Sequence, residues 1–360
     1  MKYRDMHIHG GTAKEGFLDL SVNINPLGVP GACTGEALPA QSMVDKYPEV
    51  DNEKLIGILS EKYGNPIILG NGSCELIYAI CHYTGHKYPG YSALIPVPTF
   101  GEYGHAVRAS GGRVRIFKCD PDKDFALADD LTSFTEEVSS LTGSAGDLKL
   151  VFLCNPNNPT GELIERIRIE ELAEKLGRRG VTLVVDECFL AFTGRYEDES
   201  MTYVLKDHPN VIVLDSFTKL YAMPGLRIGY AVSSDKDMLS AIREGVQPWN
   251  VSDMACEAAL AALKDDEYLS DTPEYTRELR DMMIQGLKDM SFKVIGKPLA
   301  CYVFFEGPAG LKEAINGEGI DIRDCSDMME YFDTGKHYYR MGTCKKADIE
   351  AVHKAIRRHL

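Results

Sequence analysis

The chain has 360 residues, of which 44% are hydrophobic and 26% are charged, and its net charge is −15. This length accommodates one large and one small domain, each with its own hydrophobic core. The acidic balance argues against nucleic acid and anionic membranes as partners, because both repel negative charge. An anionic small substrate would need a local cluster of arginines.

The cysteines and histidines bear on compartment and metal content. None of the 10 cysteines is in a C-x-x-C spacing, and their apolar or mixed surroundings predict reduced, buried thiols of a cytoplasmic protein. The N-terminal sequence lacks the apolar core of a signal peptide, and no run reaches the roughly 18–20 apolar residues of a membrane helix. No cysteine or carboxylate near His7, His9, His82 and His86 completes a ligand set, so we expect no metal.

Residues 1–38 are expected to form an extended N-terminal arm. The stretch D-L-S-V-N-I-N-P-L-G-V-P-G is rich in Gly, Pro and Asn and lacks helical periodicity. The alternation of Leu18, Leu20, Val22 and Ile24 predicts an ordered strand instead of a disordered tail. We expect this arm to pack with the small domain.

Residues 39–247 are expected to form the large domain. A helix over 51–64 should begin at an Asp cap and end at glycine. From about residue 66 to residue 232, helices alternate with apolar strands such as S-A-L-I-P-V, K-L-V-F-L-C, V-T-L-V-V-D and V-I-V-L. Near-continuous apolar runs are typical of a mostly parallel sheet covered on both faces, which gives an α/β fold class.

Residues 248–360 are expected to form a smaller α+β domain, with a hinge near Pro248. Helical segments over 235–247 and 252–290 precede the strand-like sequences S-F-K-V-I-G and A-C-Y-V-F-F-E. Two further strand-like stretches, G-I-D-I-R-D-C and H-Y-Y-R-M-G-T, lead into a final helix over 346–360.

Several polar residues follow directly on predicted strands. Asn158, Asp186 and Lys219 all fall just past strand ends, and ligands of such sheets bind outside the carboxyl ends of the strands. The G-N-G-S turn precedes an apolar helix whose free N–H groups would bind a phosphate. Those N–H groups belong to Gly72, Ser73 and Cys74. Many other turns share this short pattern.

The most specific pattern is V-I-V-L-D-S-F-T-K-L-Y-A-M-P-G-L-R-I-G-Y, over residues 211–230. Lys219 should be partly desolvated, and desolvation lowers the pKa of a lysine. A lysine that is neutral part of the time can attack an aldehyde and form an imine. Ser216 and Arg227 would then hold an anion beside it. The alternative is a surface lysine with a nearby ion pair.

The string S-F-T-K-x-Y-A-x-P-G-L-R-x-G-Y resembles the pyridoxal-phosphate lysine motif of fold-type I enzymes, the superfamily of aspartate aminotransferase. The resemblance implies a mostly parallel seven-stranded sheet and pyridoxal 5′-phosphate as the cofactor, bound covalently by Lys219. It also implies that the cofactor phosphate is held by Ser216, Arg227 and the backbone of Gly72, Ser73 and Cys74.

Other residues match the remaining cofactor contacts of that superfamily. Asp186 suits the ring nitrogen, because a buried carboxylate keeps it protonated. Asn158, in N-P-N-N-P-T-G, resembles the residue that binds the phenolic oxygen, and Tyr103 resembles the aromatic stacked on the ring, with core packing as its alternative. Phe189 stands where many aminotransferases carry a tyrosine, so one donor is absent. Tyr47, in K-Y-P-E, matches a tyrosine that reaches the neighbouring subunit's cofactor, which implies a homodimer.

The arm narrows the resemblance. H-G-G followed by S-x-N-I-N-P-L-G-x-P is similar to threonine-phosphate decarboxylases of cobalamin biosynthesis, although the segment over 11–23 is shorter than is usual in that family. Agreement continues through G-N-G-x-x-E, F-x-E-Y-G, P-W-x-V and Y-Y-R. The resemblance implies that Arg340 holds the substrate carboxylate. It implies further substrate contacts from His9, Gly10, Asn23, Asn158 and Arg323.

The expected reaction is decarboxylation of O-phospho-L-threonine to (R)-1-aminopropan-2-yl phosphate. The bond that breaks is the one held perpendicular to the cofactor plane, so the same residues can also support transamination. An aminotransferase of the histidinol-phosphate type is therefore the alternative, and phosphoserine is an alternative substrate. A regulatory pyridoxal-binding domain is disfavoured, because an arm of about 35 residues has no room for a helix-turn-helix module.

Overall fold

The computed structural model describes residues 9–34, 46–142 and 146–360. The helices are α2 (Glu53–Tyr63), α3 (Gly72–Lys87), α4 (Glu102–Ala109), α5 (Leu127–Leu141), α6 (Arg166–Gly177), α7 (Tyr196–Glu199), α8 (Phe217–Leu220), α9 (Lys236–Glu244), α10 (Asp253–Ala262), α11 (Asp266–Asp289), α12 (Leu311–Asn316) and α13 (Lys346–Arg357). The strands are β1 (Leu18–Asp19), β2 (Ile67–Gly70), β3 (Ser92–Val97), β4 (Arg113–Lys118), β5 (Leu148–Cys154), β6 (Thr182–Asp186), β7 (Val211–Ser216), β8 (Gly229–Val232), β9 (Lys293–Val294), β10 (Tyr302–Gly307), β11 (Ile320–Asp321), β12 (Arg323–Asp324) and β13 (His337–Gly342).

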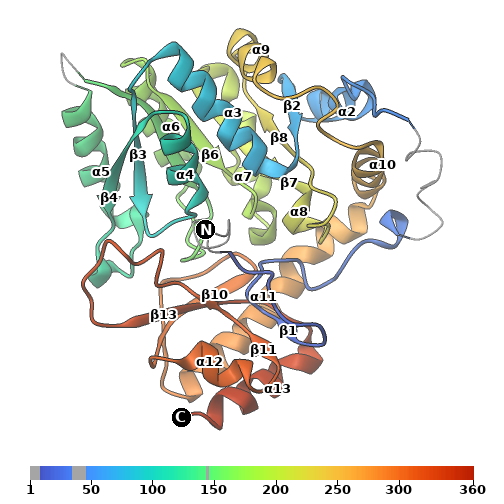
Figure 1. Ribbon diagram of the computed structural model, residues 1–360, viewed down its shortest axis with the longest axis vertical. Coiled ribbons are helices and arrows are strands. Elements are labelled where there is room, and N and C mark those ends of the chain that lie inside the picture. The colour runs from blue at the N-terminus through green and yellow to red at the C-terminus, as the bar shows by residue number, and fades with distance from the viewer. Residues whose placement is uncertain (1–8, 35–45, 143–145) are drawn as a thin grey trace.

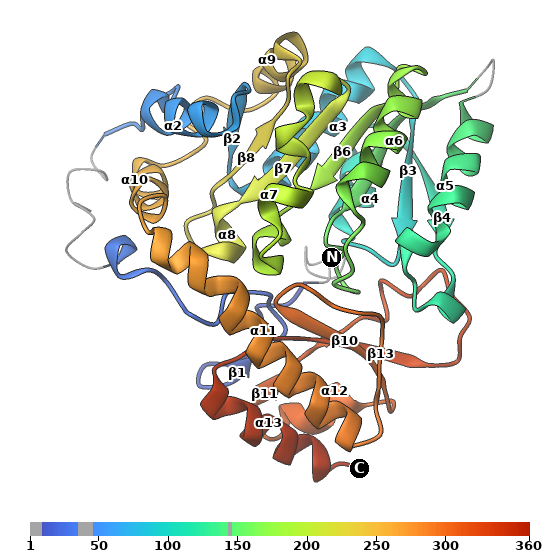
Figure 2. The same ribbon diagram turned by 180° about the vertical axis from the view of Figure 1, so that it is seen from behind.

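The larger sheet has seven strands in the order β2-β8-β7-β6-β5-β3-β4. Only β8 runs antiparallel to its neighbours, so the predicted mostly parallel sheet is confirmed. Helices α3, α4 and α9 pack in one core on one face, and α2, α5, α6 and α10 pack in a second core on the other (Figures 1 and 2). Because both faces are covered, β3, β7 and β8 are buried along their whole length, as their apolar sequences predict.

The smaller sheet has four antiparallel strands in the order β12-β13-β10-β9 and packs against α11 and α13. The N-terminal arm joins this body, since β1 pairs in parallel with β11 and Leu20 lies in the same core. Figure 1 shows the small sheet below the carboxyl ends of the large-sheet strands. The active-site candidates therefore face the boundary between the two bodies.

The arm is less regular than its apolar alternation predicts. Its strand covers only Leu18–Asp19, and over residues 21–25 the buried positions are the polar ones, Ser21, Asn23 and Asn25. Hydrogen bonding explains this reversal for Asn25, whose side-chain amide donates to the carbonyl of Leu220 and to the hydroxyl of Thr272, both at 2.8 Å. The arm is held by specific polar contacts as well as by apolar burial.

Helix α10 differs from the predicted domain division. It was assigned to the small domain, yet its buried residues Ala255, Ala258 and Ala259 pack in the core of the seven-stranded sheet. Helix α11 begins in that core with Tyr268 and continues into the small-domain core with Leu279. We therefore propose that the boundary lies within α11 instead of at residue 247. The other predicted boundary, between residues 38 and 39, lies outside the described residues.

Helix α2 ends at Gly64 in the left-handed conformation, as predicted, but it does not begin at an Asp cap. Asn52 occupies the N-cap position without a side-chain cap bond, and its side-chain oxygen Oδ1 accepts a hydrogen bond from the Cys256 thiol instead. In the described ranges, no helix combines the length and apolar character needed to cross a membrane.

Candidate active site

A cavity of about 230 Å³ lies where the arm, the large-sheet strand ends and the small sheet meet. All predicted site residues line it except Gly72 and Tyr47. A larger cavity of about 750 Å³ lies elsewhere, between α7, α8 and α11, and contains none of the predicted residues except Ser216. We place the candidate site in the smaller cavity, because the reactive and charged groups converge there.

Lys219 lies on the single-turn helix α8 directly after β7. The hydroxyl of Ser216 caps this turn by accepting from the Thr218 N–H at 3.0 Å, so the strand end fixes where the lysine emerges. Burial lowers the pKa of the Lys219 amine, and the positive charge of Arg340 lowers it further. This is the direction that the sequence predicts, and it favours the nucleophilic neutral amine.

Asp186 ends β6 and is buried, which raises the pKa of its carboxyl. Hydrogen bonds from Cys188 N–H at 3.2 Å and from the Tyr103 hydroxyl at 2.8 Å, together with the charge of Lys219, oppose that rise. The Tyr103 ring stacks on Phe152 with centroids 4.8 Å apart, so one of its faces is already covered. Tyr103 therefore has a contact that the sequence did not predict, since its hydroxyl holds the carboxylate.

A second group of residues forms a cradle at the start of α3. Gly72 has a φ of +72°, and a Cβ there would lie 2.7 Å from Nη2 of Arg227. Glycine thus permits the guanidinium to approach the backbone. Arg227 is exposed, and it donates to the carbonyls of Pro224 at 3.2 Å and Asn71 at 3.4 Å. Ser73 and Cys74 follow at the helix N-terminus, where backbone N–H groups and the helix dipole favour an anion.

Asn158 connects the two bodies of the protein. It follows β5, and its carbonyl oxygen accepts from Nη1 of Arg340 at 2.5 Å. The side-chain nitrogen of Asn158, Nδ2, makes no hydrogen bond to any described residue, so that donor remains available to a bound group. Phe189 lies beside this loop with its ring edge-on to Tyr302, at a centroid distance of 5.0 Å.

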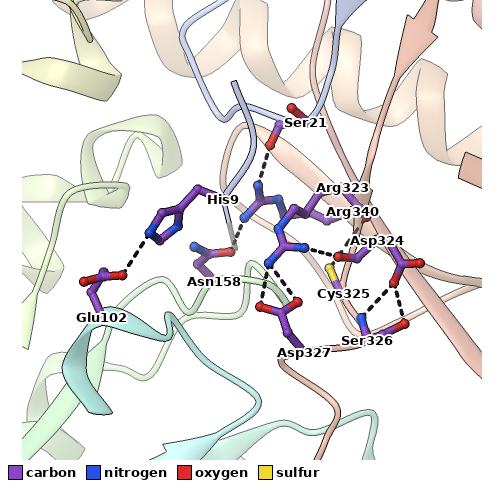
Figure 3. A network of polar contacts seen from close by, with 10 residues as sticks. All are labelled: His9, Ser21, Glu102, Asn158, Arg323, Asp324, Cys325, Ser326, Asp327 and Arg340. Atoms are coloured by element: carbon purple, nitrogen blue, oxygen red, sulfur yellow. Dashed lines mark hydrogen bonds and ion pairs between the residues drawn. The ribbon is translucent and has the colours of Figure 1, made fainter. Parts of the chain in front are cut away.

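The small domain contributes two buried arginines, drawn in Figure 3. Arg340 donates from Nη2 to the Ser21 carbonyl at 2.8 Å, while its Nε has no partner in the described ranges. Burial lowers the pKa of Arg340, and no described carboxylate forms an ion pair with it. Arg323, by contrast, pairs with Asp327. The Asn23 carbonyl oxygen nearby is buried and also lacks a partner among the described residues.

His9 reaches the cavity because the arm doubles back on itself. Gly11 N–H donates to the Ser21 hydroxyl at 2.9 Å, and a Cβ on Gly10 would collide with the Ser21 carbonyl, which accounts for the H-G-G sequence. The His9 side chain is 45% exposed and its Nε2 lies 2.9 Å from Oε1 of Glu102 (Figure 3). Sequence reasoning missed Glu102 as a site residue, although it lies within the F-x-E-Y-G motif.

Tyr47 is not brought to this cavity. Its side chain is 79% exposed, and its ring packs on Trp249 with centroids 4.8 Å apart. Its predicted contact is with the cofactor of a second subunit, and that contact stays a prediction.

Pyridoxal phosphate fits the groups that converge here. An amine with a lowered pKa, a buried carboxylate, an amide donor and an anion cradle occupy separate walls of one cavity. Each of these groups matches a different part of that cofactor, namely its aldehyde, ring nitrogen, phenolic oxygen and phosphate.

Comparison with known proteins agrees with this arrangement. The family model "Aminotransferase class I and II" matches residues 15–355. The chain is 30% identical to the threonine-phosphate decarboxylase of Salmonella typhimurium, over 97% of this chain and 95% of that protein. It is 33% identical to histidinol-phosphate aminotransferase 2 of Carboxydothermus hydrogenoformans, over 77% of this chain and 73% of that protein.

A solved structure is also similar. The histidinol-phosphate aminotransferase of Clostridium acetobutylicum superposes with a TM-score of 0.82 at 25% identity, covering 95% of this chain and 98% of that one. The fold, the converging groups and the nearly full-length match together lead to one conclusion: this chain belongs to the class I and II aminotransferase family of pyridoxal-phosphate-dependent enzymes.

Proposed function

We propose that this chain decarboxylates O-phospho-L-threonine to (R)-1-aminopropan-2-yl phosphate. The observation that carries the proposal is Arg340, a buried cation that forms no ion pair with a described carboxylate, next to a second buried arginine, Arg323. In a chain of net charge −15, such a pair is best explained by a substrate with more than one anionic group. The match to the Salmonella decarboxylase supports the phosphorylated amino acid.

The proposed roles of the residues follow from their positions. Bound pyridoxal phosphate supplies an acceptor for the electron pair that is released when a bond to the substrate Cα breaks. Lys219, with its lowered pKa, is placed to take up and return a proton. Arg340 binds the substrate carboxylate, while Arg323 and His9 hold the phosphate.

Holding both ends of the substrate fixes the rotation about the bond between its Cα and its amino nitrogen. That rotation decides which bond breaks, so the contacts of the arm and the small domain favour loss of the carboxylate over loss of the hydrogen. The amide nitrogen of Asn158 and the carboxylate of Asp186 complete the set by holding the phenolic oxygen and the ring nitrogen.

The test is to supply phosphothreonine and to follow carbon dioxide and aminopropanol phosphate. We expect both products in equal amounts without any added keto acid. Product that requires a 2-oxo acid would overturn the proposal and favour an aminotransferase of the histidinol-phosphate type. The match to the Carboxydothermus protein supports that alternative. Parallel assays with phosphoserine show whether the enzyme requires the methyl group of the substrate.

We also propose that the enzyme is a cytoplasmic homodimer that acts in cobalamin biosynthesis. Tyr47 supports the dimer, because a large aromatic pair with Trp249 lies at the surface, away from the cavity of its own chain. A mixture of Tyr47→Phe and Lys219→Ala chains tests the contact. If Tyr47 reaches the cofactor of the other subunit, each hybrid dimer has one site with both substitutions and one site with neither, so mixing should restore activity. Restoring cobalamin synthesis with aminopropanol phosphate in cells that lack the chain tests the pathway.

A further inference from the structure

The two arginines of the small domain lie directly opposite each other. Arg323 on β12 and Arg340 on β13 are register partners in an antiparallel pair, and the two residues are only 4% and 6% exposed. Figure 3 shows their guanidinium groups close together. Like charges directly opposite on neighbouring strands destabilise a sheet, and burial strengthens the repulsion.

Asp327 offsets this repulsion on one side only. Nη2 of Arg323 donates to both carboxylate oxygens of Asp327, at 2.8 and 2.6 Å, while Nη1 binds the carbonyl of Asp324. Arg340 has no such carboxylate in the described ranges. One arginine is therefore neutralised from within the protein, and the other is left for a ligand to neutralise.

Asp327 is also placed so that it can be displaced. It lies in the turn that follows β12, outside any helix or strand, and its side chain is 29% exposed. Rotation about its own side-chain bonds would return the carboxylate to water. The neighbouring Met328 and Met329 pack in a core cluster and keep the turn itself in place.

We propose that Asp327 is a specificity-determining residue, an internal anion that occupies Arg323 until the substrate phosphate displaces it. This inference rests on the proposed function. A phosphate monoester carries a charge of about −1.5 to −2 and three acceptor oxygens, whereas a carboxylate carries one charge and two oxygens. A dianionic phosphate therefore displaces Asp327, while a monoanionic group of the same shape has no electrostatic advantage over it.

The substitution Asp327→Asn in the holoenzyme tests this selection. The probes are O-phospho-L-threonine and its monoanionic counterpart, L-threonine O-sulfate, with KM or inhibition constants for each. We expect the sulfate ester to bind about tenfold more tightly to the variant, with a smaller gain for the phosphate ester, since removal of one competing charge-assisted pair favours the weaker anion more. An unchanged or wider preference for phosphate, or weaker binding of both esters, would overturn the proposal.

Two further variants show where any effect arises. Asp333→Asn removes the same charge from an exposed position of the same segment and is expected to leave both constants unchanged. Combining Arg323→Gln with Asp327→Asn is expected to abolish the gain for the sulfate ester. A gain that survives the loss of Arg323 would assign the effect to general charge and not to this pair.

A binding measurement separates this inference from the proposed function. With inorganic phosphate as the probe, we expect the thermal unfolding midpoint of Asp327→Asn holoenzyme to rise more than that of the unsubstituted protein, because Arg323 no longer has its internal carboxylate and gains a ligand. The double variant should lose this extra rise. If the enzyme fails to release carbon dioxide but this pattern appears, the proposed function fails and the role of Asp327 stands. An equal rise in all three proteins would reject that role.

Discussion

Two cavities meet at the end of β7, and they differ in the charge of their most deeply buried ionisable groups. The smaller cavity, here called the front cavity, contains Lys219 and Arg340. The larger, here called the rear cavity, contains Asp215 and five tyrosines, among them Tyr63, Tyr196 and Tyr230. Asp215 lines only the rear cavity, whereas its neighbour Ser216 lines both and so marks where the two cavities meet.

The front cavity holds cations that are short of anions. Burial lowers the pKa values of both Lys219 and Arg340. The rear cavity holds a buried anion. Burial raises the pKa of Asp215 to about 7 although the charge of Lys62 opposes that rise, and no described lysine or arginine forms an ion pair with this carboxylate. Hydrogen bonds partly stabilise that carboxylate, from Ser216 N–H at 2.6 Å and from the Tyr230 hydroxyl at 2.9 Å.

The difference separates reactive groups from structural ones. In the rear, the tyrosine hydroxyls bind one another and Asp215, with the hydroxyl oxygens of Tyr63 and Tyr230 only 2.7 Å apart, so this group of polar side chains is paired internally. The Nε of Arg280, at the same cavity, has no partner among the described residues. In the front, donors are left without partners, and a cofactor and an anionic substrate would supply them. The convergence of the amine of Lys219 with Arg340 and Asp186, and not cavity size, identifies the site.

The largest expected effect is that of Lys219→Ala. Without the amine, the front cavity keeps its cradle but loses its nucleophile, so we expect no measurable turnover and no borohydride-stable attachment of the cofactor. Absorption spectra and peptide mapping after reduction provide the measurement. A labelled peptide in the variant would show that another amine binds the cofactor covalently.

A smaller but still large effect is expected for Arg340→Gln. Losing one side of a buried charge interaction with substrate costs about 3–4 kcal/mol, which corresponds to a decrease of roughly 10²–10³-fold in kcat/KM for phosphothreonine. Because this cation lacks an internal carboxylate, stability in urea should not fall. A marked loss of stability would mean that Arg340 is structural, and the contrast between the cavities would then weaken.

The substitution Asp215→Asn tests the rear cavity through the pH dependence of the free energy of unfolding. The folded-state pKa of Asp215 is raised from 3.8 to about 7, so the folded protein binds more protons than the unfolded chain in that interval. Stability from this group is present below pH 4 and is lost as the pH rises through 7, by at most about 4 kcal/mol at 1.36 kcal/mol per pKa unit. The variant should lose less stability than the unsubstituted protein between pH 4 and 8 in urea titrations. Parallel curves for both proteins would contradict the assignment.

The smallest effect is expected for Glu102→Gln at the rim of the front cavity. His9 is 45% exposed, so its pairing with Glu102 is screened by water, and we expect an increase of only about 2- to 5-fold in KM, with kcat unchanged. Tyr78→Phe is the matched control, because it removes the 2.9 Å hydrogen bond to the other Glu102 oxygen and leaves the carboxylate in place. A change in kcat alone would argue against a positioning role.

The sequence predicted the parts of the molecule that local rules govern. Apolar runs predicted a mostly parallel sheet, and the resemblance to fold-type I enzymes implied its seven strands. The rule that ligands bind beyond strand ends predicted that Asn158, Asp186 and Lys219 lie at one site, and all three line the same cavity. The individual roles of these residues stay predictions. Lys219 was recognisable because its neighbours in sequence are also its neighbours in space.

The sequence could not predict contacts that depend on long-range packing. His9 and Glu102 are 93 residues apart, and nothing local links them. Asp327 lies four residues from Arg323, but that spacing predicts an ion pair only on a helix, and this segment is a strand followed by a turn. The arm was misread because alternation of apolar residues does not reveal which polar side chains find buried partners.

Helix α11 links the position of the small domain to the geometry of the candidate site, because it packs in the cores of both domains. Its 24 residues span about 36 Å at 1.5 Å per residue, with one end anchored under the large sheet and the other under the small one. A tilt of about 5° about its first turns moves the far end by roughly 3 Å over that length. The strand that carries Arg340 packs in the same core as that end of the helix, so a tilt of this size would change the distance between Arg340 and Lys219 by a few ångströms at most.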